Sequence, residues 1–153
     1  SVKFRTDVAM MGKLGFDINI QDLTSDELAF CQQAVSNYKR LRPAITRGDE
    51  YRLVSPYEGE HAATQFVAKD KSQSVLFTFN KYPCYDEQNY PVRLAGLDPD
   101  RYYRVREINL MPNKQSWLSC NDNVYSGDYL MTVGLDVLTA HKLVSHVIEI
   151  TVE

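Results

Sequence analysis

The chain has 153 residues, of which 44% are hydrophobic and 24% are charged, as in an ordinary folded domain. Seventeen Lys and Arg residues against 20 Asp and Glu residues give a formal net charge of −3, so the overall charge does not attract nucleic acid or an anionic membrane surface. No apolar run approaches the roughly 18 residues that a membrane-spanning helix needs. These properties favour one domain with a sizeable core and exclude nucleic-acid and membrane partners.

The N-terminal segment begins with Ser1 rather than Met, in the middle of a periodic pattern, which is typical of a chain cut from a longer protein. Val2 to Met11 mixes β-branched and apolar residues and ends at a glycine, which favours a strand. Phe16 to Ile20 alternates apolar and polar residues and favours a second extended piece. The cellular compartment stays open.

A helix follows these extended pieces. Thr24 and Glu27 have the spacing of a capping box, which predicts the helix start. The apolar stripe behind them recurs at three- and four-residue steps, at Leu28, Cys31, Val35 and Tyr38. Because a proline disfavours a helical residue before it, Pro43 predicts a break near Arg42, and a short further turn then ends at Gly48.

After Gly48 the hydrophobic period changes to two residues. Seven short strands are predicted, at 51–55, 62–68, 74–79, 91–95, 103–108, 126–134 and 146–152. The second and third are joined by the turn-forming residues 69–72. Short strands at about ten-residue spacing, without helices between them, predict an antiparallel β-sandwich of about seven to eight strands. The boundary near Gly48 divides the chain into residues 1–47, with a strand and a helix, and residues 48–153, with the sandwich.

The sequence contains no recognisable catalytic or metal-binding pattern. Most carboxylates stand at turns or helix starts, and Asp7, inside the first predicted strand, is as consistent with a structural role as with a catalytic one. The three histidines do not have the spacing of metal ligands, and the three widely separated cysteines are interpreted as small, partly buried thiols. No nucleophile elbow or phosphate-binding loop occurs. We therefore expect no catalytic residue, metal site or cofactor in this chain.

Aromatic residues gather in two predicted loops. Tyr82, Tyr85 and Tyr90 stand in one of them and Trp117 in another. Such rings either cover the edge of the sheet and pack against a neighbouring domain, or form a platform on which sugars stack. The sequence leaves both interpretations open.

The order of several motifs resembles the C-terminal part of glycoside hydrolase family 36 α-galactosidases. The similar segments span nearly the whole chain in order, at 4–17, 38–43, 48–53, 55–58, 70–72, 94–99, 103–107 and 126–131. No single segment is diagnostic, but together and in register they are specific. In this resemblance the first segment corresponds to the last strand of a (β/α)8 barrel and the turn after it.

The resemblance implies a parent enzyme with a catalytic barrel and this C-terminal antiparallel domain. The family removes terminal α-linked galactose with retention, using two aspartates on earlier barrel strands, so no catalytic residue is carried over to this chain. Residues 1–47 then form the last β/α unit of the barrel, and Met10, Met11 and Gly12 border the substrate pocket of the parent. The implied partners are the rest of the parent, its α-galactoside substrate and a second copy of the enzyme.

Two other functions remain open at this level. The Tyr and Trp loops favour a galactoside-binding module, and the exposed N-terminal unit favours a domain devoted to protein–protein contacts. The leading interpretation is a non-catalytic domain that braces the barrel and contributes subunit contacts.

Overall fold

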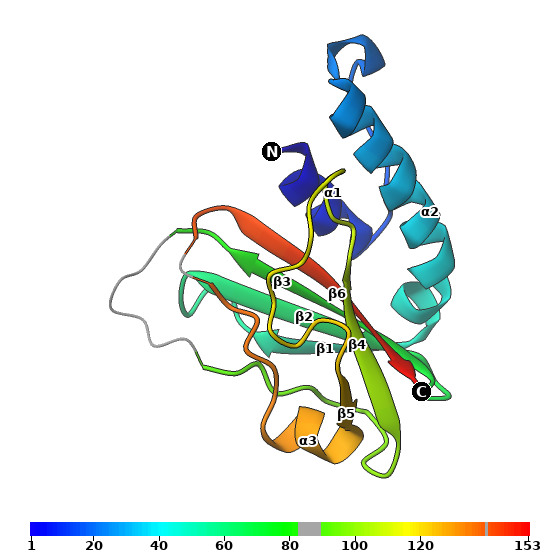
Figure 1. The fold of residues 1–153 in the computed structure, drawn as a ribbon, viewed down its shortest axis with the longest axis vertical. Helices are drawn as coiled ribbons and strands as arrows, with labels where there is room; N and C mark the ends of the chain where they lie inside the picture. Colours follow the sequence, from blue (N-terminus) through cyan, green and yellow to red (C-terminus); the bar gives the residue numbers. More distant parts are fainter. Residues whose placement is uncertain (83–89, 140) are drawn as a thin grey trace.

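The computed structural model describes residues 1–82, 90–139 and 141–153, and its described strands form one antiparallel sheet (Figure 1). Six strands follow one another across the sheet in the order β1-β2-β3-β6-β4-β5. Their bounds are Asp49–Val54 for β1, His61–Val67 for β2, Gln73–Asn80 for β3, Tyr102–Ile108 for β4, Val124–Ser126 for β5 and Val144–Val152 for β6. The prediction of a mainly antiparallel β fold is confirmed.

The β2–β3 hairpin forms where the sequence predicts it. The two strands pair in continuous register from His61 opposite Asn80 to Val67 opposite Ser74. The connecting turn contains Lys71 in the left-handed region, with φ of 59°, and the Asp70 carboxylate accepts a hydrogen bond from the backbone N–H of Ser72 at 3.0 Å. These are local interactions, which is why the pattern alone locates the turn.

The predicted strand at the N-terminus is wrong, because Val2–Met10 forms the helix α1. Its buried residues include Val2, Thr6 and Met10, four residues apart, which is the spacing of one helical face. The Ser1 hydroxyl caps the helix by accepting a hydrogen bond from the backbone N–H of Phe4 at 3.3 Å. The residues after it, 13–19, lie outside every described helix and strand, and a short 3-10 helix covers Ile20–Asp22.

The long helix α2, Ser25–Arg47, begins as predicted but does not break at Pro43. The Thr24 hydroxyl accepts from the Glu27 N–H at 3.2 Å, and the Glu27 carboxylate accepts from the Thr24 N–H at 3.0 Å, which completes the capping box. Pro43 lies in the last turns, where packing on the sheet holds the helix and one missing N–H is tolerated. The predicted break near Arg42 is therefore wrong.

Gly48 follows the last residue of α2, but it does not adopt the left-handed conformation of a glycine cap. Its φ is −76°, an ordinary value for any residue. A Cβ at this position would collide with the carbonyl oxygens of Ala44 and Val67. The glycine is needed because the end of α2 crosses closely over β2.

Two further predicted strands are not strands. Residues 127–132, within the predicted strand 126–134, form the helix α3, Gly127–Thr132, because the Ser126 hydroxyl caps it by accepting from the Tyr129 N–H at 3.1 Å. In the predicted strand 91–95 the structure shows a single bridge, between Val92 and Leu135. The described part of the chain therefore has six strands in one sheet instead of seven or eight in two, and coil with α3 takes the place of a second sheet.

Both faces of the sheet are covered. In the view of Figure 1, α1 and α2 lie together above the sheet and α3 lies below it. The helical layer packs on one face, in a core that includes Met10, Phe30, Leu41, Phe66, Val75, Phe77 and Val147. Coil and α3 pack on the other, in a core that includes Leu76, Leu94, Leu97, Tyr103, Val105, Leu118, Leu130, Leu135, Ile148 and Ile150. Residues 1–47 thus share a core with the sheet.

Candidate functional site

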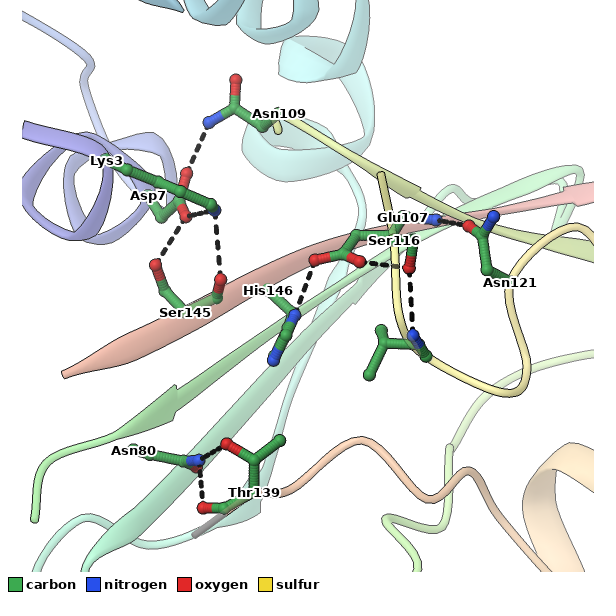
Figure 2. A network of polar contacts seen from close by, with 11 residues as sticks. Lys3, Asp7, Asn80, Glu107, Asn109, Ser116, Asn121, Thr139, Ser145 and His146 are labelled. Carbon is green, nitrogen blue, oxygen red and sulfur yellow. Dashed lines mark hydrogen bonds and ion pairs between the residues drawn. The ribbon is translucent and has the colours of Figure 1, made fainter. Parts of the chain in front are cut away.

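A buried carboxylate fastens α1 to the sheet. The side chain of Asp7 is completely buried and accepts hydrogen bonds from the Ser145 hydroxyl at 2.7 Å, from the Asn109 amide and from the Lys3 ammonium (Figure 2). Lys3 also donates to the backbone carbonyl of Ser145 at 3.1 Å. These residues come from α1, from the end of β4 and from the start of β6. Asp7 therefore has the role of a satisfied structural carboxylate.

Burial raises the pKa of Asp7, although Lys3, Ser145 and Asn109 act in the opposite direction. The folded protein thus takes up this proton at a higher pH than the unfolded chain does. The stability that the protonated group contributes is present below the ordinary pKa near 3.8 and is lost as the pH rises through the raised pKa.

We expect Asp7→Asn to lower the free energy of unfolding by about 1–3 kcal/mol at neutral pH, because its amide NH2 would face other donors. Since asparagine does not titrate, the difference in stability between wild type and variant should widen on acidification. Urea unfolding followed from pH 7 to pH 4 measures it, with the exposed Asp17→Asn as the matched control at neutral pH. A difference that narrows towards acid pH would contradict this role.

The three residues predicted to border a substrate pocket lie at the end of α1. Met10 is completely buried, and its sulfur lies 3.4 Å from the Asn109 amide nitrogen. Met11 is half-buried and lines a hollow of about 400 Å³ together with Tyr57, which follows β1, and with residues of β1 and β2. Gly12 is exposed, and its carbonyl accepts a hydrogen bond from Tyr38 of α2 at 2.6 Å.

A second buried polar cluster lies on the opposite face of the sheet. Glu107 of β4 and His146 of β6 are 6% and 3% exposed, and the Glu107 Oε1 lies 2.6 Å from the His146 Nδ1 (Figure 2). Glu107 pairs with Ile148 in the β4–β6 register, so His146 is its diagonal neighbour on the same face. The Ser116 hydroxyl donates to the other carboxylate oxygen, and Asn121 accepts from the Glu107 backbone N–H at 2.7 Å.

The electrostatics of this cluster favour an ionised carboxylate. Burial acts to raise the pKa of Glu107, but the hydrogen bonds from His146 and Ser116 and the adjacent imidazole outweigh it and hold the pKa below its ordinary value. A carboxylate only accepts, so the proton between the two groups belongs to Nδ1 of His146. The Nε2 of His146 and the hydroxyl of Thr78, directly across the strand pair, are buried with no hydrogen-bond partner among the described residues.

Sequence reasoning missed the pairing of Glu107 with His146, although one signal was present. The alternation of 103–108 placed Glu107 on the same face as Tyr103 and Val105, both of which are completely buried. A carboxylate in such a position needs a partner, because an unpaired buried charge is costly. The sequence does not show which residue the register brings to it.

A third polar contact holds the segment before β6. The Asn80 amide donates to the backbone carbonyl and, at 2.5 Å, to the hydroxyl of Thr139 (Figure 2). The other end of the Asn80 side chain lies 2.7 Å from the Nδ1 of His61. Buried hydrogen bonds of this kind fix a coil against the sheet without creating a reactive group.

The aromatic and cysteine predictions have mixed outcomes. Tyr82, Tyr90 and Trp117 are exposed, with 57%, 67% and 58% of their surface accessible. Cys31 and Cys120 are free thiols, as predicted, but they are buried rather than partly buried, and burial raises the pKa of Cys120 to about 11. Tyr85 and Cys84 lie outside the described residues.

Within residues 1–82, 90–139 and 141–153 no three His, Cys, Asp or Glu side chains are arranged to hold a metal ion. In the same residues no helix is both long and apolar enough to cross a bilayer.

These features define a mainly antiparallel β domain with a helical layer on one face and structural polar clusters at its joints. The sequence matches the family described as "Glycosyl hydrolase family 36 C-terminal domain" over residues 61–150, and the chain belongs to this family.

Named relatives and solved structures agree with the family. Alpha-galactosidase AgaA of Geobacillus stearothermophilus is 35% identical over 138 residues, which cover 88% of this chain and 17% of that protein. Alpha-galactosidase C of Emericella nidulans is 34% identical over 134 residues, covering 88% and 16%. The crystal structure of the family 36 α-galactosidase AgaB from Geobacillus stearothermophilus superposes on the whole chain with a TM-score of 0.85 at 30% identity, and 19% of that structure is covered. The chain thus spans less than a fifth of the length of these relatives.

Proposed function

We propose that this chain is the non-catalytic C-terminal domain of a larger enzyme that removes terminal α-linked galactose from oligosaccharides. The observation that carries the proposal is the family match over residues 61–150, together with relatives named as α-galactosidases. A solved relative, an AgaA variant from Geobacillus stearothermophilus with a TM-score of 0.84 and 29% identity, is described as a complex with raffinose. The cleavage chemistry belongs, in this proposal, to the barrel that precedes the chain.

The domain's own task would be to brace that barrel. Phe16, Ile20 and Leu28 are exposed, and they border a hollow of about 200 Å³ along one side of α2. A contiguous set of exposed apolar side chains is typical of a surface that another part of the protein covers. Residues 1–47 would then be the last β/α unit of the barrel. In the structure these residues form α1, the 3-10 helix Ile20–Asp22 and α2, with coil at 13–19.

The border of the substrate pocket also remains a proposal. Met11 lines a surface hollow and Gly12 is exposed, so both are accessible at the end of α1. Met10 is buried against Asn109 and would act by supporting its two neighbours. We also propose that the domain contributes to contacts between subunits of the larger enzyme.

The purified 153-residue chain is expected not to release nitrophenol from p-nitrophenyl α-galactoside, whereas the full open reading frame should do so. Turnover by the chain alone would contradict the non-catalytic assignment, and an inactive full protein would contradict the parent activity. In the full protein, Phe16→Asp and Ile20→Asp should reduce soluble, active enzyme several-fold, because each would place a charge in the proposed barrel contact. Val133→Asp, at a residue that is 46% exposed beyond α3, is the matched control.

A protein-interaction domain is the rival function, and it uses the same exposed surface. Size-exclusion chromatography of the chain, with and without Phe16→Asp, separates the two. If the chain were a dimer and Phe16→Asp made it monomeric, the exposed surface would serve self-association rather than contact with the barrel.

A further inference from the structure

The ring of Trp117 is exposed although the residues around it are fixed. It is the only tryptophan of the chain, and 58% of its surface is accessible. Its ring makes edge contacts with His146, with centroids 5.2 Å apart, and with His141, at 6.2 Å. His146 is buried, so one side of the indole rests on the sheet while the remainder faces outward.

The backbone on both sides of Trp117 is anchored to the interior. Ser116 donates its hydroxyl hydrogen to Glu107 and accepts a hydrogen bond from the Leu118 N–H at 3.2 Å (Figure 2). Leu118 itself is buried in the core of the coil layer. A ring held in this way loses little conformational freedom when a ligand arrives, which lowers the cost of binding.

His141 contacts Trp117, and the residue after it contacts a second exposed ring. This next residue, Lys142, holds its ammonium 5.1 Å from the centre of the Tyr82 ring. Tyr82 is 57% exposed. We call these four residues, Trp117, His141, Lys142 and Tyr82, the Trp117 surface.

The Trp117 surface lies on the opposite face of the sheet from α1 and α2. Successive residues of β6 show this, because Ser145 contacts Asp7 of α1, whereas His146 contacts Glu107 and Trp117. The apolar surface proposed to meet the barrel belongs to α2 and the segment before it. On the proposed function, the Trp117 surface therefore faces away from that contact.

We propose that the Trp117 surface binds one ring of a neutral oligosaccharide. The carbon-bound hydrogens of a pyranose ring form an apolar face that stacks on indole, and its hydroxyl oxygens accept hydrogen bonds from Lys142 and His141. Lys142 is the one permanently charged group of the four, which suits hydroxyls better than a multiply charged ligand.

Melibiose is chosen as a probe because it is a galactoside, so this choice rests on the proposed function. Maltose contains no galactose, so a test with maltose does not depend on that function. Melibiose or maltose should change the fluorescence of Trp117 saturably, with a dissociation constant on the order of millimolar, as expected for one weakly held ring. Saturable binding of either sugar supports the proposal. A change that stays linear with both sugars would overturn it, whether or not the full protein hydrolyses α-galactosides.

Two variants connect binding to this surface. In Trp117→Ala, calorimetry or ligand-observed NMR should show at least about a tenfold loss of affinity. Tyr102→Ala, at a ring of β4 that is 63% exposed, should bind as the wild type does. Equal affinity in Trp117→Ala would contradict the site. If the chain formed a concentration-dependent dimer and Trp117→Ala abolished it, the occupant of the Trp117 surface would be a second copy of the chain. That result would overturn the sugar proposal.

Discussion

Replacing Glu107 with leucine is expected to lower the free energy of unfolding by about 3–5 kcal/mol, because it leaves two buried hydrogen-bond donors without an acceptor, at about 1–3 kcal/mol each. Glu107 and His146 are almost inaccessible, and the carboxylate also accepts from Ser116. Leucine would leave the His146 Nδ1–H and the Ser116 hydroxyl without an acceptor. Urea unfolding, followed by far-ultraviolet circular dichroism, measures the loss.

The control for this prediction is the removal of both partners. Glu107→Leu combined with His146→Leu should recover part of the loss, because apolar residues of similar volume often replace a buried pair at little cost. It also removes the Nε2 that has no partner among the described residues. Glu153→Leu, which breaks an exposed pair with Arg104, should have a much smaller effect than Glu107→Leu. A double variant that is no more stable than Glu107→Leu would contradict the explanation.

Replacing Phe30 with alanine is expected to destabilise the protein by about 3–5 kcal/mol, as for other completely buried phenylalanines. Phe30 is on α2 and is 0% exposed, in the core that α2 shares with Phe66 and Phe77 of the sheet. Because the core is shared, the helices and the sheet should unfold in one transition. Circular dichroism reports the helices, and the fluorescence of Trp117 reports the far side of the sheet.

Phe16→Ala is the matched control, since this phenylalanine is 38% exposed in the same N-terminal segment. It should change stability far less than Phe30→Ala. If Phe30→Ala shifted the helical signal and left the Trp117 transition unchanged, residues 1–47 would be an independently unfolding unit, and the shared core would not couple them to the sheet.

The parts of the fold that the sequence predicts correctly depend on neighbours in the chain. The capping box of Thr24 and Glu27 and the turn at Lys71 involve residues at most a few positions apart, so their chemistry is visible in the sequence. Two helices, α1 and α3, lie where the sequence predicts strands. Both are short, and each is capped by a serine, Ser1 or Ser126, whose signal a mixed apolar pattern obscures.

The polar clusters were beyond sequence reasoning because they join distant segments. Asp7 meets Ser145 across 138 residues, and Glu107 meets His146 across 39. Both contacts depend on β6 lying between β3 and β4, an order that local patterns do not specify. The alternation of 103–108 puts Glu107 on the same face as Tyr103 and Val105, and Asp7 stands inside the first predicted strand, but a register is needed to find their partners.

The position of β6 has a consequence for how the protein is made. It is the last strand in the sequence, yet it lies in the middle of the sheet and pairs with both β3 and β4. The hairpins β1–β2–β3 and the pair β4–β5 can form during synthesis, but their adjoining edges stay open until residues 144–152 leave the ribosome exit tunnel. Until then the nascent chain exposes two unpaired strand edges, the feature that invites pairing with other chains. During this interval the chain is most exposed to aggregation.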